Sequence, residues 1–299
     1  SITTASAYIA DISDDSNRSK NFGMIGAAFG LGFIIGPVIG GLLGQFGSRV
    51  PFYAAAVLCL VNFAYGYFIL PESLGKEHRR PFERKRANPV GSLLKVRTHP
   101  EILKLFIAWF LVYLASHAVQ TNWAYFTMYK FAWDEKTVGI SLGVMGAFTA
   151  FVQGFLIRKV HPKLGSERSI LYGIMFYCTG MLLFAFAQKE WMMYAILAIY
   201  CLGGIAGPAL QSVISSKVSP KEQGDLQGAL TSVISITSII GPLLMTQIFY
   251  FFTHPDAKIK LLTLELKPPF QFSGAPFFLG FALMAVSAYF VYYVFHRKK

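Results

Sequence analysis

The sequence predicts an all-α membrane protein, and three observations support this fold class. Of its 299 residues, 54% are hydrophobic and only 14% are charged, whereas charged residues make up about a quarter of a soluble domain. Apolar runs of about 20 residues, the length that crosses a bilayer as a helix, recur along the chain. Most of the 27 Lys and Arg residues stand in the polar joints between these runs, as the positive-inside rule describes.

The net charge of +12 does not indicate a nucleic-acid-binding protein. Such a protein gathers its basic residues on one solvated face beside side chains that read bases. Here the basic residues separate apolar runs instead. We therefore expect a lipid bilayer, and no nucleic acid, as the partner of this chain.

Eight apolar runs are long enough to cross a membrane, and the residues before them resemble the last turns of one more span. The partial span covers Ser1 to Ile12. The full spans are Asn21 to Phe46, Pro51 to Leu70, Glu101 to Tyr129, Thr137 to Ile157, Arg168 to Gln188, Trp191 to Ser216, Leu226 to Phe252 and Pro276 to His296.

The longest polar interval, Glu72 to Pro100, contains the run RRPFERKR and is predicted to be a cytoplasmic linker between two helix bundles. If this linker lies in the cytoplasm, alternation of the spans puts 20 of the 27 Lys and Arg residues on the cytoplasmic side. A bias of this size is enough to set the orientation of the chain.

Two spans share a pattern that indicates an internal duplication. Gly23, Gly36 and Pro37 have counterparts 205 positions later, at Gly228, Gly241 and Pro242. If the two spans correspond, about a hundred residues and three and a half helices are expected ahead of Ser1. We therefore predict two six-helix bundles, with about eight and a half of the helices in this chain. Residues 1–71 would end the first bundle with its fourth, fifth and sixth helices, 72–100 the linker, and 101–299 the C-terminal bundle.

Glycine recurs at every fourth position in the first full span, at Gly32, Gly36, Gly40 and Gly44. On a helix this spacing removes the side chains from one strip, so that a neighbouring helix can approach closely. Close packing within a membrane bundle is one interpretation of the strip. A specific role in gating or coupling is the other.

Eight stretches, in the same order along the chain, resemble the major facilitator superfamily and, within it, the tetracycline-resistance efflux proteins. They are YIADI from Tyr8, GPVIGG from Gly36, PFYAAA from Pro51, LPES from Leu70, WDEKTVGISL from Trp133, GGIAGPALQ from Gly203, QGDLQG from Gln223 and GPLLMT from Gly241.

The resemblance implies a twelve-helix, multi-pass exporter of the inner (plasma) membrane that exchanges protons for a drug by alternating access. It implies that the glycine strip is similar to the antiporter motif of the family's fifth helix; the helix-packing positions are Gly32, Gly36, Pro37, Gly40, Gly41, Gly44, Gly241 and Pro242. It also places Arg158, Gly165 and Arg168 in the weaker copy of the family's charged cytoplasmic loop, although Arg158 replaces the usual leading glycine.

Two positions depart from the tetracycline exporters. Tyr177 stands where they carry an essential aspartate, and Thr149 stands where they carry a histidine. Neither residue can act as a carboxylate near neutral pH, because tyrosine titrates near 10. Proton coupling would then depend on the part of the protein ahead of this chain.

Polar side chains are costly in hydrocarbon, so those inside the spans are the candidates for a substrate pathway. These candidates are His117, Gln120, Thr149, Gln153, Tyr177 and Gln211. His117 and Gln120 are three residues apart and are expected to share a helix face. Lining a central cavity and ordinary hydrogen bonding between helices are both open for this pair.

The favoured function is proton-driven export of an amphipathic small molecule by a monomer without a cofactor. Transport of an ordinary metabolite and a non-transporting membrane sensor are the alternatives. An enzyme is not expected, because the six His residues are dispersed and no catalytic or metal-binding spacing occurs. The three Cys residues, at 59, 178 and 201, lie inside apolar runs and are expected to be reduced packing residues.

Overall fold

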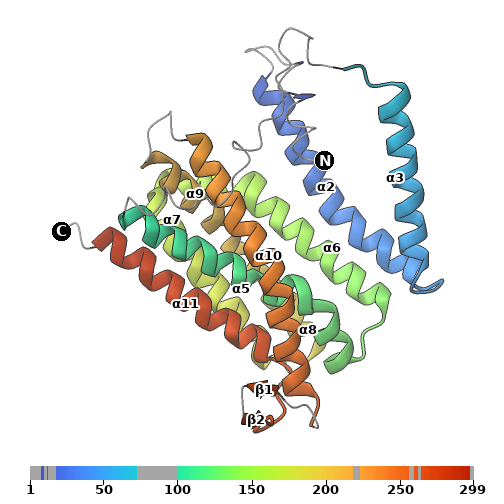
Figure 1. Ribbon diagram of the computed structural model, residues 1–299, viewed down its shortest axis with the longest axis vertical. Coiled ribbons are helices and arrows are strands. Elements are labelled where there is room, and N and C mark those ends of the chain that lie inside the picture. The colour runs from blue at the N-terminus through green and yellow to red at the C-terminus, as the bar shows by residue number, and fades with distance from the viewer. Residues whose placement is uncertain are drawn as a thin grey trace. The chain divides into compact units, whose positions relative to one another are not determined.

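A computed structural model describes residues 8–9, 12, 18–72, 100–217, 223–255, 259–261 and 264–296. Almost every element in this part of the chain is a helix (Figure 1). The elements are α2 (Arg18–Gly44), α3 (Val50–Phe68), α5 (Pro100–Phe131), α6 (Glu135–Phe151), the π-helix η3 (Val152–Leu156), α7 (Ile157–Phe186), α8 (Glu190–Leu202), the 3₁₀-helix η4 (Gly203–Ile205), α9 (Ala206–Ser216), α10 (Gln223–Thr253), β1 (Ile259–Leu261), β2 (Leu264–Leu266) and α11 (Ala275–His296).

The helices have the length and composition of membrane spans. Within the described residues, six helical segments are long and apolar enough to cross a bilayer, and a shorter apolar helix covers Gly30–Gly44. One of the six, Glu135–Phe186, contains two of the predicted spans, because the chain stays helical through the joint expected between them. The prediction of an all-α membrane protein is confirmed. The partial span at residues 1–12 and the linker at 72–100 fall largely outside the described residues.

Two compact units are distinguished by their internal contacts. The first comprises Ser1–Ala87 and Asp134–Ala147, and the second comprises Asn88–Trp133 and Phe148–Lys299. The predicted division into residues 1–71, 72–100 and 101–299 differs from these ranges at the start of α6, and it stays a prediction for the whole protein.

In the first unit, α2 packs against the start of α6 through glycine. A Cβ on Gly41 would lie 2.9 Å from the Cα of Gly139 and 2.7 Å from the backbone oxygen of Glu135, so neither glycine position has room for a side chain. The start of α6 is fixed by Asp134, whose Oδ1 accepts the Thr137 N–H over 2.8 Å as an N-cap.

In the second unit, α11 packs against both α5 and α7 (Figure 1). The Ser287 hydroxyl donates to the Ala108 backbone oxygen over 3.0 Å and joins α11 to α5. On α7, a Cβ on Gly173 would lie 2.7 Å from the backbone nitrogen of Ala206, and one on Gly180 would lie 2.8 Å from the Cβ of Tyr200. Small residues therefore allow the helix backbones to approach closely, as is common in membrane bundles.

Three interruptions break the regular α-helices of this unit. Gly165 has φ 73° and separates two helical pieces within α7, so the cytoplasmic joint predicted between Arg158 and Arg168 is helical apart from a kink at this glycine. The other two are η3 at the end of α6 and η4 between α8 and α9. Turns η3 and η4 are neighbours in space: a Cβ on Gly204 in η4 would lie 3.8 Å from Nε2 of Gln153 in η3.

A small hairpin lies between α10 and α11, in the interval that separates the last two predicted spans, Leu226 to Phe252 and Pro276 to His296. Strands β1 and β2 pair antiparallel, with Lys260 opposite Glu265. The strands have three residues each, too few for the alternating pattern that predicts a strand.

Candidate functional site

A cavity of about 270 Å³ opens within the second unit, among helices α5, α7, α9 and α11 and the two irregular turns η3 and η4. Its polar lining consists of Ser116, Gln120, Gln153 and Gln211, and its aromatic lining of Trp109, Tyr113 and Tyr177. The remaining lining residues are Val112, Gly204, Gly207, Pro208 and Met284. Amides, hydroxyls and rings from different spans thus converge on one space.

Helix α5 supplies one polar edge of the cavity. Trp109, Tyr113, Ser116 and Gln120 are spaced four, three and four residues apart, which places them along one helix face. The Ser116 hydroxyl donates to the Tyr113 backbone oxygen over 2.7 Å and accepts the Gln120 Nε2 donor over 3.1 Å. The Gln120 side-chain oxygen makes no hydrogen bond to the described residues.

The irregular turns position the next two polar groups. Gln153 belongs to η3, and π turns of this kind widen a helix locally and occur often at functional sites. The Tyr177 ring of α7 lies against η4, where a Cβ on Gly203 would be 2.5 Å from the ring. This ring also contacts Tyr200, with the ring centroids 4.9 Å apart. A side chain at residue 203 would therefore push Tyr177 out of its place in the cavity wall.

Helix α9 supplies Gln211, which links the cavity to α10. Its Nε2 donates to Gln227 Oε1 over 3.2 Å, and Gln227 Nε2 donates to Ser215 Oγ over 3.4 Å. Gln211 therefore connects the cavity wall to α10, because its partner Gln227 lies on that helix and outside the lining.

Of the six pathway candidates from the sequence, four line this cavity: Gln120, Gln153, Tyr177 and Gln211. The other two do not. His117 is buried and its ring occupies the space beside Gly241 of α10, and the Thr149 hydroxyl lies 3.7 Å from Cys201 Sγ, to which it donates. His117 and Gln120 thus have different surroundings despite their spacing. A pathway role for any of the six stays a prediction.

Trp109, Tyr113 and Ser116 were not among the sequence candidates. Their spacing from Gln120 could have identified them, because residues three or four positions apart lie on the same face of a helix. If a polar residue in a span faces a cavity, its neighbours on that face are expected to line the cavity too. Trp109 is 2% exposed, and its indole N–H has no hydrogen-bond partner among the described residues.

The glycine positions of α2 differ in what they contact. Gly41 packs on Gly139, and a Cβ on Gly44 would lie 3.2 Å from the Glu135 Cβ. At Gly32, Gly36 and Gly40 a Cβ would meet nothing within 4 Å in the described part of the chain. The helix contact therefore runs along one edge of the predicted strip.

The other predicted packing positions lie on α2 and α10. The Pro37 backbone oxygen approaches Gly139. On α10, the Thr246 hydroxyl donates to the Pro242 backbone oxygen over 2.7 Å, and Gly241 leaves room for His117. In the predicted cytoplasmic joint, the Ser169 hydroxyl donates to the Gly165 backbone oxygen over 2.7 Å, while Arg158 and Arg168 are exposed.

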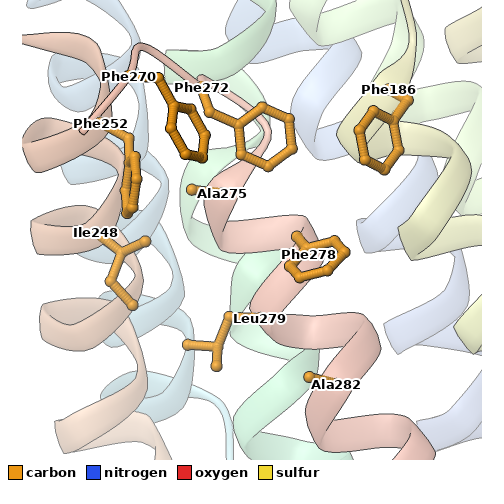
Figure 2. Close-up of a pocket in the computed structure, with 9 residues that line it drawn as sticks. All are labelled: Phe186, Ile248, Phe252, Phe270, Phe272, Ala275, Phe278, Leu279 and Ala282. Carbon is orange, nitrogen blue, oxygen red and sulfur yellow. The ribbon is translucent and has the colours of Figure 1, made fainter. Parts of the chain in front are cut away.

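A second cavity, of about 600 Å³, has an entirely different character. Figure 2 shows its lining, which includes five phenylalanines (186, 252, 270, 272 and 278) and the aliphatic residues Ile248, Ala275, Leu279 and Ala282. None of these side chains can form a hydrogen bond, so the cavity can offer apolar contact but no polar recognition.

No group of three or more His, Cys, Asp or Glu side chains within the described ranges is arranged to hold a metal ion. The side chains of Cys59, Cys178 and Cys201 are present as thiols and not as disulfides.

Comparisons with known proteins place these features in context. A family model described as the Major Facilitator Superfamily matches residues 1–242. The tetracycline resistance protein, class C, of Escherichia coli is 38% identical over 245 residues, which are 82% of this chain and 62% of that protein. The tetracycline resistance protein, class H, of Pasteurella multocida is 31% identical over 297 residues, which are 97% of this chain and 68% of that protein.

A likeness also exists among solved structures. The crystal structure of the human organic anion transporter MFSD10 (TETRAN) superposes with a TM-score of 0.63 at 21% identity, over 96% of this chain and 66% of that one. This likeness supports the fold alone. The chain spans about three fifths of the length of the class C relative.

Proposed function

Because this chain belongs to the major facilitator superfamily, and within it to the tetracycline-resistance proteins, we propose that it forms part of a secondary active transporter that exports a drug or another amphipathic small molecule. We include proton antiport as the energy source, the bacterial inner membrane as the location, and a monomer as the working unit. The relatives named for tetracycline resistance support drug export.

The observation that carries this proposal is the cavity with Gln120, Gln153 and Gln211 in its wall. Amide side chains are costly inside a membrane unless they face a cavity or a partner. Three of them, contributed by three different helices, surround one space together with aromatic rings. Such a mixture of polar groups and rings is typical of small-molecule sites.

The irregular turns support alternating access. Turns η3 and η4 interrupt neighbouring helices at the cavity wall, and Gly204 and Gln153 face each other there. Non-α turns are weaker than α-helix and commonly act as hinges. In this proposal the helix pieces beyond the turns tilt to close the cavity on one side of the membrane.

The proton carrier of this mechanism is not supplied by the cavity wall. None of the lining residues that the structure describes is an Asp, Glu or His. The antiport proposal therefore assigns the proton to groups elsewhere in the whole protein, which couple to the cavity through the change of conformation.

The proposal is tested by efflux from cells that express the complete gene. Cells are loaded with Nile red, a neutral aromatic dye, and the decay of fluorescence is followed after glucose is added. Faster decay than in cells with an empty vector, abolished by a protonophore, is the expected result. Dye retention equal to the vector control, with the protein present in the membrane, contradicts export.

A further inference from the structure

Among the described residues, the lining of the polar cavity contains no side chain that carries a charge at neutral pH. The twelve lining residues in the described part of the chain include three glutamines, two tyrosines, one serine and one tryptophan, and no Asp, Glu, Lys, Arg or His. The chain carries 27 basic and 15 acidic residues in total, so the neutrality of this wall is a property of the site and not of the composition.

Hydrogen-bonding capacity remains in this wall. The side chains of Gln153 and Tyr177 make no hydrogen bond to the described residues, and the described bonds of Gln120 and Gln211 use only their Nε2 donors. A glutamine side chain has one carbonyl oxygen and two N–H donors. The three amides can therefore accept from and donate to the same ligand.

The aromatic rings of the wall provide the contact surface for the apolar part of a ligand. Trp109, Tyr113 and Tyr177 line the cavity together, and aromatic rings favour stacked or edge-to-face contact with another ring. A planar aromatic ligand with polar groups on its rim can contact the rings and form hydrogen bonds to the glutamine amides at the same time.

Two opposing energies bear on a cationic ligand. Contact with an aromatic face stabilises a cation. Moving a charge into the membrane interior without a counter-ion costs more free energy than contact with an aromatic face returns. No carboxylate among the described lining residues offsets this cost.

We propose that this cavity selects uncharged aromatic molecules that carry both hydrogen-bond donors and acceptors, and that it discriminates against permanent cations of the same shape. This inference rests on the proposed function, because it assigns the substrate class of the same transporter.

The test compares two ligands with one ring system. Ethidium is a planar permanent cation, and 3,8-diamino-6-phenylphenanthridine is the same ring system without the N-ethyl group and its permanent charge. Binding of each is measured by fluorescence titration of the purified protein from the complete gene, in detergent at pH 7.5. The variants are Gln153→Leu, in the cavity wall, and Gln247→Leu, an exposed position of α10 outside the wall.

The neutral phenanthridine is expected to bind about tenfold more tightly than ethidium, which corresponds to about 1.4 kcal/mol. Gln153→Leu is expected to weaken the neutral ligand about 3- to 10-fold, as loss of one hydrogen bond does, and Gln247→Leu to leave it unchanged. Equal or tighter binding of ethidium overturns the inference, as does failure of both ligands to bind. Neutral-selective binding without protonophore-sensitive efflux supports the inference and contradicts only the proposed export function.

Discussion

Gln211 Nε2 lies 3.2 Å from Gln227 Oε1, so a residue of the cavity wall on α9 is hydrogen bonded to α10. A ligand acceptor that takes this N–H must compete with Gln227. The strength of ligand binding and the contact between the two helices are therefore coupled through one amide group.

Replacing Gln227 with Leu should free the Gln211 amide for the ligand. Because a net hydrogen bond contributes about 0.5–1.5 kcal/mol, affinity for the neutral phenanthridine should rise about 2- to 10-fold. Ser215→Ala removes the hydrogen bond from Gln227 to Ser215 and leaves the bond between Gln211 and Gln227 in place, so it should have a smaller effect. Fluorescence titration measures both. Weaker binding in Gln227→Leu would show that Gln227 assists the ligand and does not compete with it.

Glycine positions 40 and 41 of α2 should respond differently to one substitution. A Cβ at Gly41 meets Gly139 at 2.9 Å, whereas one at Gly40 meets nothing within 4 Å in the described chain. Gly41→Ala should destabilise the fold by about 1–3 kcal/mol, the usual range for overpacking. Thermal unfolding of the purified protein gives the comparison, and Gly40→Ala is the matched control. Equal losses in the two variants would contradict the α2–α6 contact.

Gly241 and His117 should behave as a coupled pair. A methyl group at Gly241 collides with the His117 ring, so Gly241→Ala should cost about 1–3 kcal/mol. Adding His117→Ala should restore part of the loss, giving a coupling energy of about 0.5–3 kcal/mol. The two single variants and the double variant are compared by thermal unfolding. Strict additivity of the single effects would mean that the residues do not touch.

The Asp134 N-cap should make stability depend on pH in the acid range. Hydrogen bonds from the Thr137 side chain and backbone lower the pKa of the Asp134 carboxyl below its ordinary 3.8. A carboxylate with a lower pKa in the folded state stabilises the fold above its unfolded pKa, and this contribution is lost as the pH falls through the folded pKa.

Two variants separate the cap from its charge. Asp134→Asn keeps a good cap without titration, so its melting temperature should fall less steeply than that of the wild type below the ordinary pKa of 3.8. Asp134→Ala should be less stable than either over the whole range. Parallel curves for the wild type and Asp134→Asn would mean that this carboxylate does not contribute to the acid transition.

The helices could be predicted from the sequence because a bilayer demands apolar runs of one length, and few other folds produce them. The joint around Gly165 could not, because its charged residues look like a loop although they extend two helices. The β1–β2 hairpin was missed because three-residue strands have no detectable period.

Part of the candidate site could also be predicted from the sequence. Gln120, Gln153 and Gln211 were identified because an amide in a span is unusual, and they line one cavity. Trp109 and Tyr113 were not, since rings occur in nearly every span of this chain. His117 could not be distinguished from Gln120 by spacing alone, because its place depends on the gap at Gly241, a residue more than a hundred positions away.

The central claim is that the cavity with Gln153 and Gln211 in its wall is the route of transport. The most direct measurement is protonophore-sensitive efflux of Nile red by cells that express the complete gene with both residues replaced by Leu, compared with Gln247→Leu at the same protein level. We predict that the double variant loses efflux by tenfold or more, at least about 1.4 kcal/mol, while Gln247→Leu retains the wild-type rate. Wild-type efflux in the double variant would contradict the claim.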